Sequence, residues 1–139
     1  MNVSAEQAEL IADSHARFSR MAEDYAALFY HRLFDRHPFA RSLFPDDMTR
    51  QVIVFRASID ALVEAIDDLP SLRPTLADLA RRHVQYGVKP HHYPQVGTVL
   101  IDTFDEMSPG GFPAETRAAW EALYADVARI MLAAAYPPA

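Results

Sequence analysis

The sequence predicts an all-α protein, and three observations carry that prediction. Apolar side chains recur every three or four residues through most of the chain, which is the spacing of an amphipathic helix. Half of the residues are hydrophobic, yet there are only four glycines, too few for a turn-rich β-sandwich. A length of 139 residues fits one domain, spanning 1–139, with a substantial core. We therefore expect roughly six helices, no strands and a single layered unit.

Composition and charge exclude several classes of function. The formal net charge is -6 and the 13 lysines and arginines are scattered, which argues against nucleic-acid binding. Charged residues interrupt the segment 1–20, so it contains neither a signal peptide nor a membrane span, and we expect a cytoplasmic protein. Without cysteine, the chain can form no disulfide, no thiolate metal site and no covalent haem attachment.

The first two expected helices place a polar side chain among apolar ones. Ser4 and Gln7 form a capping-box pattern that opens a helix continuing to Phe18. A second helix is expected over 21–36, where Tyr30 shares a stripe with apolar residues. The phenol hydroxyl needs a partner there, which is ordinarily a backbone carbonyl.

An irregular, proline-bounded turn follows. Over 38–47 it should hold the bulky Phe44 inward. A helix then runs over about 49–66, with Gln51 one turn before Phe55 on the inner face. Gln51 is therefore expected near the same interior as Phe55.

A corner between two helices organises the second half of the chain. The apolar spacing of 76–84 presents His83 on the face that enters the core. Gly87 supplies a helix stop, and Pro90 is expected to begin the next helix, with Tyr93 in its first turn. His83 and Tyr93 can therefore face one cavity.

The last two helices are separated by the clearest break in the chain, at 108–111. The stripe headed by Tyr93 extends to Met107, and Pro113 opens the final helix. The inner face of that helix is expected to be Trp120, Leu123, Tyr124, Val127, Met131, Ala134 and Ala135. The residues expected to point outward are Glu121, Asp126 and Arg129.

Several landmarks coincide along the chain. They are Phe29-Tyr30-His31-Arg32-Leu33-Phe34, His37-Pro38, Leu43-Phe44, Gln51, Leu69-Pro70, His83, Lys89-Pro90 and His92-Tyr93-Pro94-Gln95-Val96-Gly97. In their order and spacing, the chain resembles the globin domain of bacterial flavohaemoglobins and the single-domain bacterial haemoglobins. The match covers nearly the whole chain, apart from a shorter segment after Phe44. It implies a three-on-three globin fold around a b-type haem (iron protoporphyrin IX) held without covalent bonds.

The resemblance also implies roles for particular residues. His83 matches the proximal iron ligand, while Tyr30 and Gln51 match a distal polar pair that can hydrogen-bond dioxygen. Phe44 matches an aromatic that stacks on the porphyrin, and Arg82 takes the place of a basic residue that pairs with a propionate. The other residues implied at the haem are Phe55, Tyr93, Val96 and Leu100.

In two respects the chain departs from that family. It ends at Ala139 and contains no G-x-G-x-x-G fingerprint, so we expect no reductase domain and no reduction of the iron from NADH by this chain. The family also carries a glutamate on the last helix that engages the proximal histidine, and alignment from Trp120 puts Ala135 there. A backbone carbonyl one turn before His83 is then the expected hydrogen-bond acceptor.

From the helix pattern alone, other interpretations stay open. His83 could be a core histidine bonded to a carbonyl, Tyr30 a core tyrosine, and Gln51 a solvated residue near a helix start. The histidines expected at the surface are His15, His31, His37, His91 and His92. The last two are adjacent, but no third ligand is spaced to complete a second metal site.

Haem ligation leaves several functions open. The leading hypothesis is reversible binding of dioxygen, nitric oxide, carbon monoxide or similar ligands, as in oxygen delivery or storage. The first alternative is an enzyme, a nitric oxide dioxygenase that oxidises nitric oxide to nitrate with electrons from a separate reductase. A gas sensor, which the missing output domain disfavours, and a haem-free interaction module, which Tyr30 and His83 disfavour, are further alternatives. We expect binding rather than turnover.

Overall fold

The computed structural model describes residues 3–136, which fold into helices without any strand. The α-helices are α1 (Ala5–Phe18), α2 (Tyr25–Arg36), α3 (Thr49–Glu64), α4 (Arg73–Gln85), α5 (His92–Met107) and α6 (Ala114–Ala135). Two 3-10 helices, η1 (Pro38–Leu43) and η2 (Ile66–Leu72), lie before α3 and α4. The all-α prediction is confirmed. Within this part of the chain, no helix combines the length and the apolar character needed to cross a membrane.

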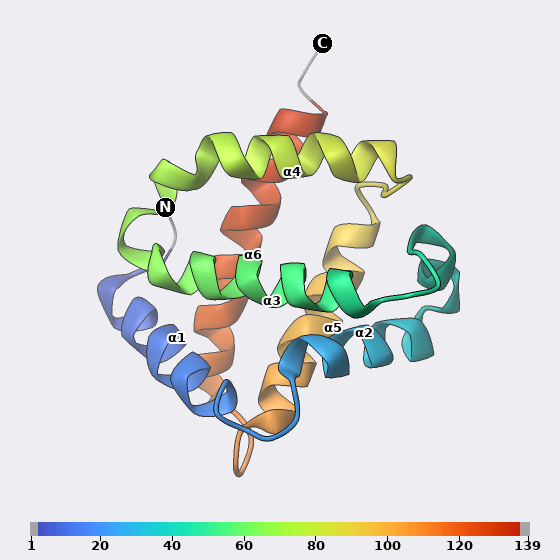
Figure 1. Ribbon diagram of the computed structural model, residues 1–139. Helices are drawn as coiled ribbons and strands as arrows, with labels where there is room; N and C mark the ends of the chain where they lie inside the picture. Colours follow the sequence, from blue (N-terminus) through green and yellow to red (C-terminus); the bar gives the residue numbers. More distant parts are fainter. Residues whose placement is uncertain (1–2, 137–139) are drawn as a thin grey trace.

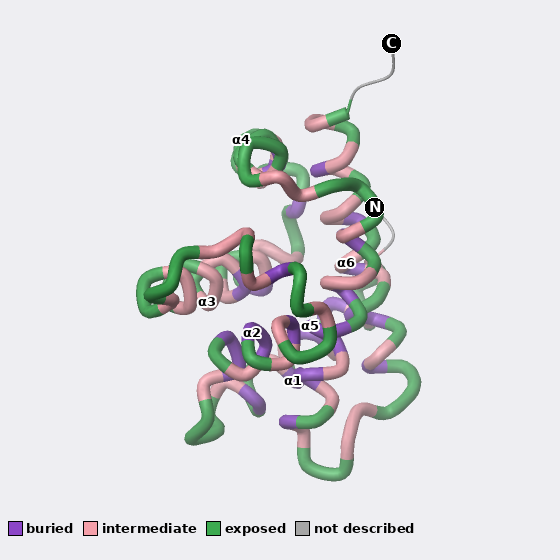
Figure 2. Tube along the Cα trace, turned by 90° about the vertical axis from the view of Figure 1, so that its right-hand side faces the viewer, coloured by how far each residue is buried: buried purple, intermediate pink, exposed green. Residues whose placement is uncertain are grey.

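The helices form two crossed layers. In Figure 1, α3 and α4 run across the front of α5 and α6. The long helix α6 packs against α1, α4 and α5, while α2 packs against α3 and α5. Figure 2 shows that the buried residues gather along α1, α2, α5 and α6, whereas α3 and α4 are mostly half-buried or exposed. The main core therefore lies behind α3 and α4 rather than between them.

Local hydrogen bonds decide where the first two helices begin. The Ser4 hydroxyl accepts from the Gln7 N–H, and the Gln7 side chain accepts from the Ser4 N–H, both at 3.1 Å. The predicted capping box is confirmed. The second helix begins at Tyr25 rather than at Met21, because the Asp24 carboxylate accepts from the backbone N–H two residues later and caps the helix there.

The corner between α4 and α5 was predicted in outline but not in detail. Gly87 adopts φ of +91°, a conformation that side chains with a Cβ rarely take, so α4 ends as expected. The next helix begins at His92 instead of Pro90. Pro90 lies in a turn, where the imidazole Nδ1 of His92 accepts from the Lys89 N–H at 2.9 Å. Helix α3 likewise ends early, at Glu64, where η2 takes over.

Two polar residues predicted at the surface lie inside. Asp126 is fully buried on α6 and forms an ion pair with Arg129. Because α6 packs on three other α-helices, it buries a wider arc than the single stripe that periodicity predicts. The side chain of His15 is only 16% exposed, and its Nε2 lies 2.7 Å from a carboxylate oxygen of Asp60. The expectations for Asp126 and His15 were therefore wrong.

His15 belongs to a polar node that joins α1, α2 and α3. The hydroxyl of the fully buried Tyr25 donates to Asp60 at 2.7 Å. The guanidinium of Arg56 lies over the Tyr25 ring, 4.7 Å from its centroid, and pairs with Asp24 at 3.2 Å. Charge and aromatic contacts thus fix the back of α3 against the first two helices.

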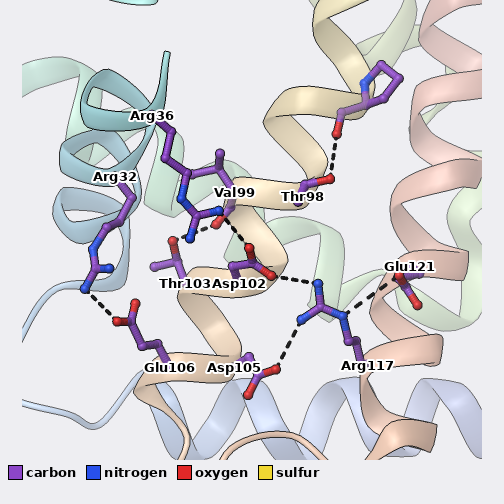
Figure 3. A network of polar contacts seen from close by, with 11 residues as sticks. Arg32, Arg36, Thr98, Val99, Asp102, Thr103, Asp105, Glu106, Arg117 and Glu121 are labelled. Atoms are coloured by element: carbon purple, nitrogen blue, oxygen red, sulfur yellow. Dashed lines mark hydrogen bonds and ion pairs between the residues drawn. The ribbon is translucent and has the colours of Figure 1, made fainter. Parts of the chain in front are cut away.

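A second network ties α2 and α6 to α5 (Figure 3). Asp102 on α5 accepts from Arg36 of α2 and from Arg117 of α6, each at 2.7 Å. Arg117 also reaches Asp105 at 3.1 Å. A single aspartate is therefore shared by arginines from both neighbouring helices.

Candidate functional site

His83 lies half-buried in the last turn of α4. Its Nδ1 is 2.8 Å from the carbonyl oxygen of Leu79, the acceptor one turn earlier that the sequence predicts. A carbonyl can only accept, so Nδ1 carries the proton and Nε2 presents its lone pair. Burial lowers the pKa of His83; the bond to Leu79 opposes this shift and the charge of Arg82 adds to it. The neutral ring can therefore ligate a metal through Nε2.

Tyr30 and Gln51, on α2 and α3, are brought together. The amide Nε2 of Gln51 donates to the Tyr30 hydroxyl at 3.0 Å, so the phenol has a side-chain partner instead of a carbonyl. Burial raises the pKa of Tyr30 to about 12, although the bond from Gln51 acts in the opposite direction. The hydroxyl keeps its proton at neutral pH. That proton has no acceptor among residues 3–136 and can be donated to a ligand.

Aromatic rings hold the Tyr30 phenol in position. Its centroid lies 5.3 Å from that of Phe44, which follows η1, and 5.4 Å from that of Phe55 on α3. Phe55 in turn stacks on Phe29 at 4.8 Å with an interplanar angle of 15°. Phe34 stacks on Tyr30 from one turn further along α2, at 5.9 Å. Four rings from three segments therefore fix one hydroxyl.

On the other side of the predicted site, Tyr93 stands near His83. Their ring centroids are 6.3 Å apart. Tyr93 is 7% exposed, and its buried hydroxyl has no hydrogen-bond partner within residues 3–136. Burial raises the pKa of Tyr93, and Tyr136 adds to the shift. Ala135 packs against the apolar cluster that contains Tyr93, and its methyl side chain cannot form a hydrogen bond with the Tyr93 hydroxyl.

Tyr124 supports this region from α6, a role that the sequence did not suggest. Its hydroxyl donates to the carbonyl of Tyr93 at 2.6 Å. A Cβ added at Gly97 would lie only 2.5 Å from the Tyr124 ring, so the ring occupies space left by the glycine. The sequence did contain a signal for this contact. Gly97 lies on the inner face of one predicted helix and the large Tyr124 on the inner face of the next, a pairing that allows close packing.

The remaining predicted contacts lie around these groups. Leu100 is buried and Val96 half-buried on α5, following Tyr93 at helical spacing. Arg82, next to His83, is exposed and forms no ion pair with any residue of 3–136. Its guanidinium is therefore available to a carboxylate of a bound cofactor.

The apolar surface of α3 and α4 fits a flat apolar cofactor such as haem. Within the described chain these helices make almost no close contact with each other, and each has only two buried residues. Val54 and Val84, the neighbours of Phe55 and His83, remain 47% and 42% exposed. Among residues 3–136 no group of three or more metal-binding side chains converges.

A comparison with protein families decides the fold. The family model described as Globin matches residues 27–131. The chain belongs to the globin family. Globins bind haem, so the general expectation of a haem protein is confirmed for this globin at the level of its family. The predicted three-on-three globin fold is confirmed as well, because its structural neighbours are bacterial globins.

Proteins from other bacteria are similar to this globin in sequence. It is 30% identical to a flavohemoprotein of Vibrio cholerae over 75% of its own length, but it spans only 27% of that protein. It is 29% identical to an uncharacterized globin-like protein of Aquifex aeolicus, covering 94% of this chain and 92% of the relative.

Solved structures agree with these sequence matches. A bacterial globin from Campylobacter jejuni superimposes with a TM-score of 0.82 at 25% identity, covering 95% of this chain and 96% of that one. An engineered carbene transferase, derived from a candidate nitric oxide dioxygenase of Rhodothermus marinus, gives 0.79 at 25% identity, with 93% and 90% covered.

Proposed function

We propose that this globin holds haem b against α3 and α4 and binds dioxygen reversibly, as in oxygen delivery or storage. His83 would ligate the iron through Nε2, and Tyr30 with Gln51 would lie on the ligand side. The residues that would contact the macrocycle are Phe44, Phe55, Arg82, Tyr93, Val96 and Leu100. When bound, the haem supplies a ferrous iron that takes diatomic ligands, including nitric oxide and carbon monoxide.

The hydrogen bond from His83 to the Leu79 carbonyl is the observation that favours reversible ligand binding over oxidative catalysis. Its acceptor is a neutral carbonyl at 2.8 Å. A carboxylate acceptor would make the imidazole more basic and a stronger donor to a metal. Ala135 cannot supply a carboxylate, and the nearby Tyr93 hydroxyl has no partner within residues 3–136. These features support moderate electron donation and therefore reversible ligand binding.

On the ligand side, Tyr30 supplies a hydrogen-bond donor that is already oriented. Gln51 donates to its oxygen at 3.0 Å, which leaves the O–H proton directed at another acceptor. A hydrogen bond to a partly anionic ligand contributes about 1.5–3 kcal/mol. That contribution favours retention of dioxygen over ligands that stay neutral.

A nitric oxide dioxygenase with an external reductase is the alternative. The structural similarity to a protein derived from a candidate enzyme of that kind favours it. In both functions Tyr30 would donate a hydrogen bond to a ligand of the haem. The two functions differ in whether dioxygen is released unchanged or used to oxidise nitric oxide to nitrate.

Absorption spectra of the purified, haem-loaded protein test the proposal. We expect a five-coordinate ferrous form, and repeated cycles of oxygenation and deoxygenation with little loss of the oxygenated spectrum. His83→Ala should lose the ferrous spectrum and regain it with added imidazole, which serves as the control for folding. Sustained consumption of nitric oxide with NADH and a separate flavin reductase, at a rate far above autoxidation, would instead support the enzyme. A protein that takes up no haem would refute both.

A further inference from the structure

The corner between α4 and α5 carries an unusual balance of charge. Residues 79–101 contain no aspartate or glutamate, although the chain has 19 of them and a net charge of -6. Arg81, Arg82 and Lys89 lie in this stretch and are exposed. An acidic protein thus has a stretch of 23 residues around His83 that carries positive but no negative side chains.

Contacts from η1 join this segment where α5 begins. The ring of His92 lies 4.9 Å from that of Phe39 and 4.3 Å from that of His91. Burial lowers the pKa of His92, and the charges of His91, Lys89 and His37 lower it further, which shows how closely these groups gather.

Exposed aromatic rings accompany the positive charges. Phe39 is 46% exposed and Tyr86 is 61% exposed. Lys89 has no ion-pair partner within residues 3–136, and Arg81 has only the exposed Asp78 at 3.4 Å. We call Phe39, Arg81, Tyr86, Lys89 and His91 the corner surface. Aromatic side chains and arginine are enriched in protein interfaces, and Lys89 adds positive charge to them.

We propose that the corner surface docks an acidic one-electron donor protein of the [2Fe–2S] ferredoxin class, which returns oxidised haem iron to the ferrous state. This inference rests on the proposed haem function. The reduced ferredoxin loses one electron and the ferric iron gains one, with no atom transferred. The corner joins the helices that carry His83 and Tyr93, so a donor seated there is close to the haem. Opposite charges would steer the encounter.

Charge reversal on the surface tests the docking. The variant is Lys89→Glu with Arg81→Glu, neither of which has been placed in the haem site. The matched control is Arg17→Glu with Arg20→Glu, two exposed arginines without ion-pair partners in the described chain. Arg17 lies in the last turn of α1 and Arg20 two residues after the helix ends. In Figure 1 this end of α1 lies far from the corner between α4 and α5. Both variants change the net charge equally.

The measurement is anaerobic stopped-flow reduction of the ferric protein by a reduced plant-type [2Fe–2S] ferredoxin. We expect the second-order rate constant to fall with ionic strength, and to fall roughly tenfold in the corner variant while the control stays within about twofold of the parent. Chemical-shift changes in the globin on adding oxidised ferredoxin, a readout that needs no electron transfer, should centre on Lys89 and Tyr86. Equal slowing in both variants, or shift changes elsewhere, would overturn the docking surface.

Carbon monoxide rebinding separates the two proposals. It should be the same in the parent, the corner variant and the control, because the haem site is untouched. If haem binds and carbon monoxide rebinds normally, but the rate constant for reduction depends neither on ionic strength nor on the charge reversal, only the docking inference fails. If the protein binds no haem, the proposed function fails, and the docking inference that rests on it fails with it.

Discussion

Tyr30 combines a buried phenol, one accepted hydrogen bond and four surrounding rings, which makes the effect of its hydroxyl separable from that of its ring. In Tyr30→Phe the ring contacts stay and only the donor is lost. We expect dioxygen dissociation to accelerate roughly ten- to a hundredfold, corresponding to about 1.5–3 kcal/mol. Stopped-flow displacement of dioxygen by carbon monoxide measures the rate. Tyr25→Phe is the control, because it removes a buried hydroxyl from the polar node and should leave dissociation unchanged.

Ala135 allows the opposite experiment, in which a missing group is added. Ala135→Glu places a carboxylate on α6 beside the cluster that contains Tyr93. If the carboxylate captures the His83 N–H from Leu79, the imidazole becomes a stronger donor. We expect the iron–histidine stretch in resonance Raman spectra of the ferrous protein to rise above that of the parent, with Ala135→Gln as the uncharged control. A parent stretch already as high as that of the Glu variant would remove the physical basis for preferring binding over catalysis.

At the scale of the elements, α5 is held between α2 and α6 by the network around Asp102. Exposed pairs contribute little on their own, but Arg117 joins a network of half-buried groups. Arg117→Ala should lower the free energy of unfolding by about 1–2 kcal/mol, and high salt should reduce that difference. Arg81→Ala, which breaks one isolated exposed pair, should cost less than about 0.5 kcal/mol. Urea unfolding at low and high salt would contradict this if the two variants behaved alike.

The elements also show what a sequence can and cannot predict. The order of the helices, the outline of the corner and the Leu79 acceptor follow from spacing and local stereochemistry, so they were predicted correctly. The ends of helices depend on single capping residues such as Asp24, and the periodicity of apolar residues does not show where these caps act. The burial of Asp126 and His15 depends on neighbours distant in sequence. The meeting of Gln51 with Tyr30 was predicted only through a family resemblance, because two helices must cross to bring them together.

For the whole molecule, acid stability should depend on the two shared aspartates. Burial acts to raise the pKa of Asp60, but bonds from Tyr25 and His15 outweigh it and lower the pKa; Asp102 behaves likewise with Arg36 and Arg117. A carboxyl with a lowered pKa stabilises the fold above its unfolded pKa of about 3.9 and loses that contribution as pH falls through the folded value.

We therefore expect the free energy of unfolding to decline between about pH 5 and pH 3, and to decline less steeply in Asp60→Asn and Asp102→Asn. Urea titrations across that range measure the slopes. Asp78→Asn is the control, since its carboxylate meets only the exposed Arg81 at 3.4 Å. Parallel curves for parent and variants would show that other carboxyls govern acid unfolding.

The fit between Gly97 and Tyr124 links two helices in a way that constrains how this globin can change over generations. Because the ring occupies the space where a Cβ would sit, neither position can vary freely while the other is kept. A smaller residue at 124 would leave a void and free the Tyr93 carbonyl, whereas alanine at 97 would push the ring away from it. If positions 97 and 124 are substituted one after the other, the protein that carries only the first substitution is less stable than the parent. The start of α5, and with it the backbone that carries Tyr93, is therefore expected to drift more slowly than the helices around it.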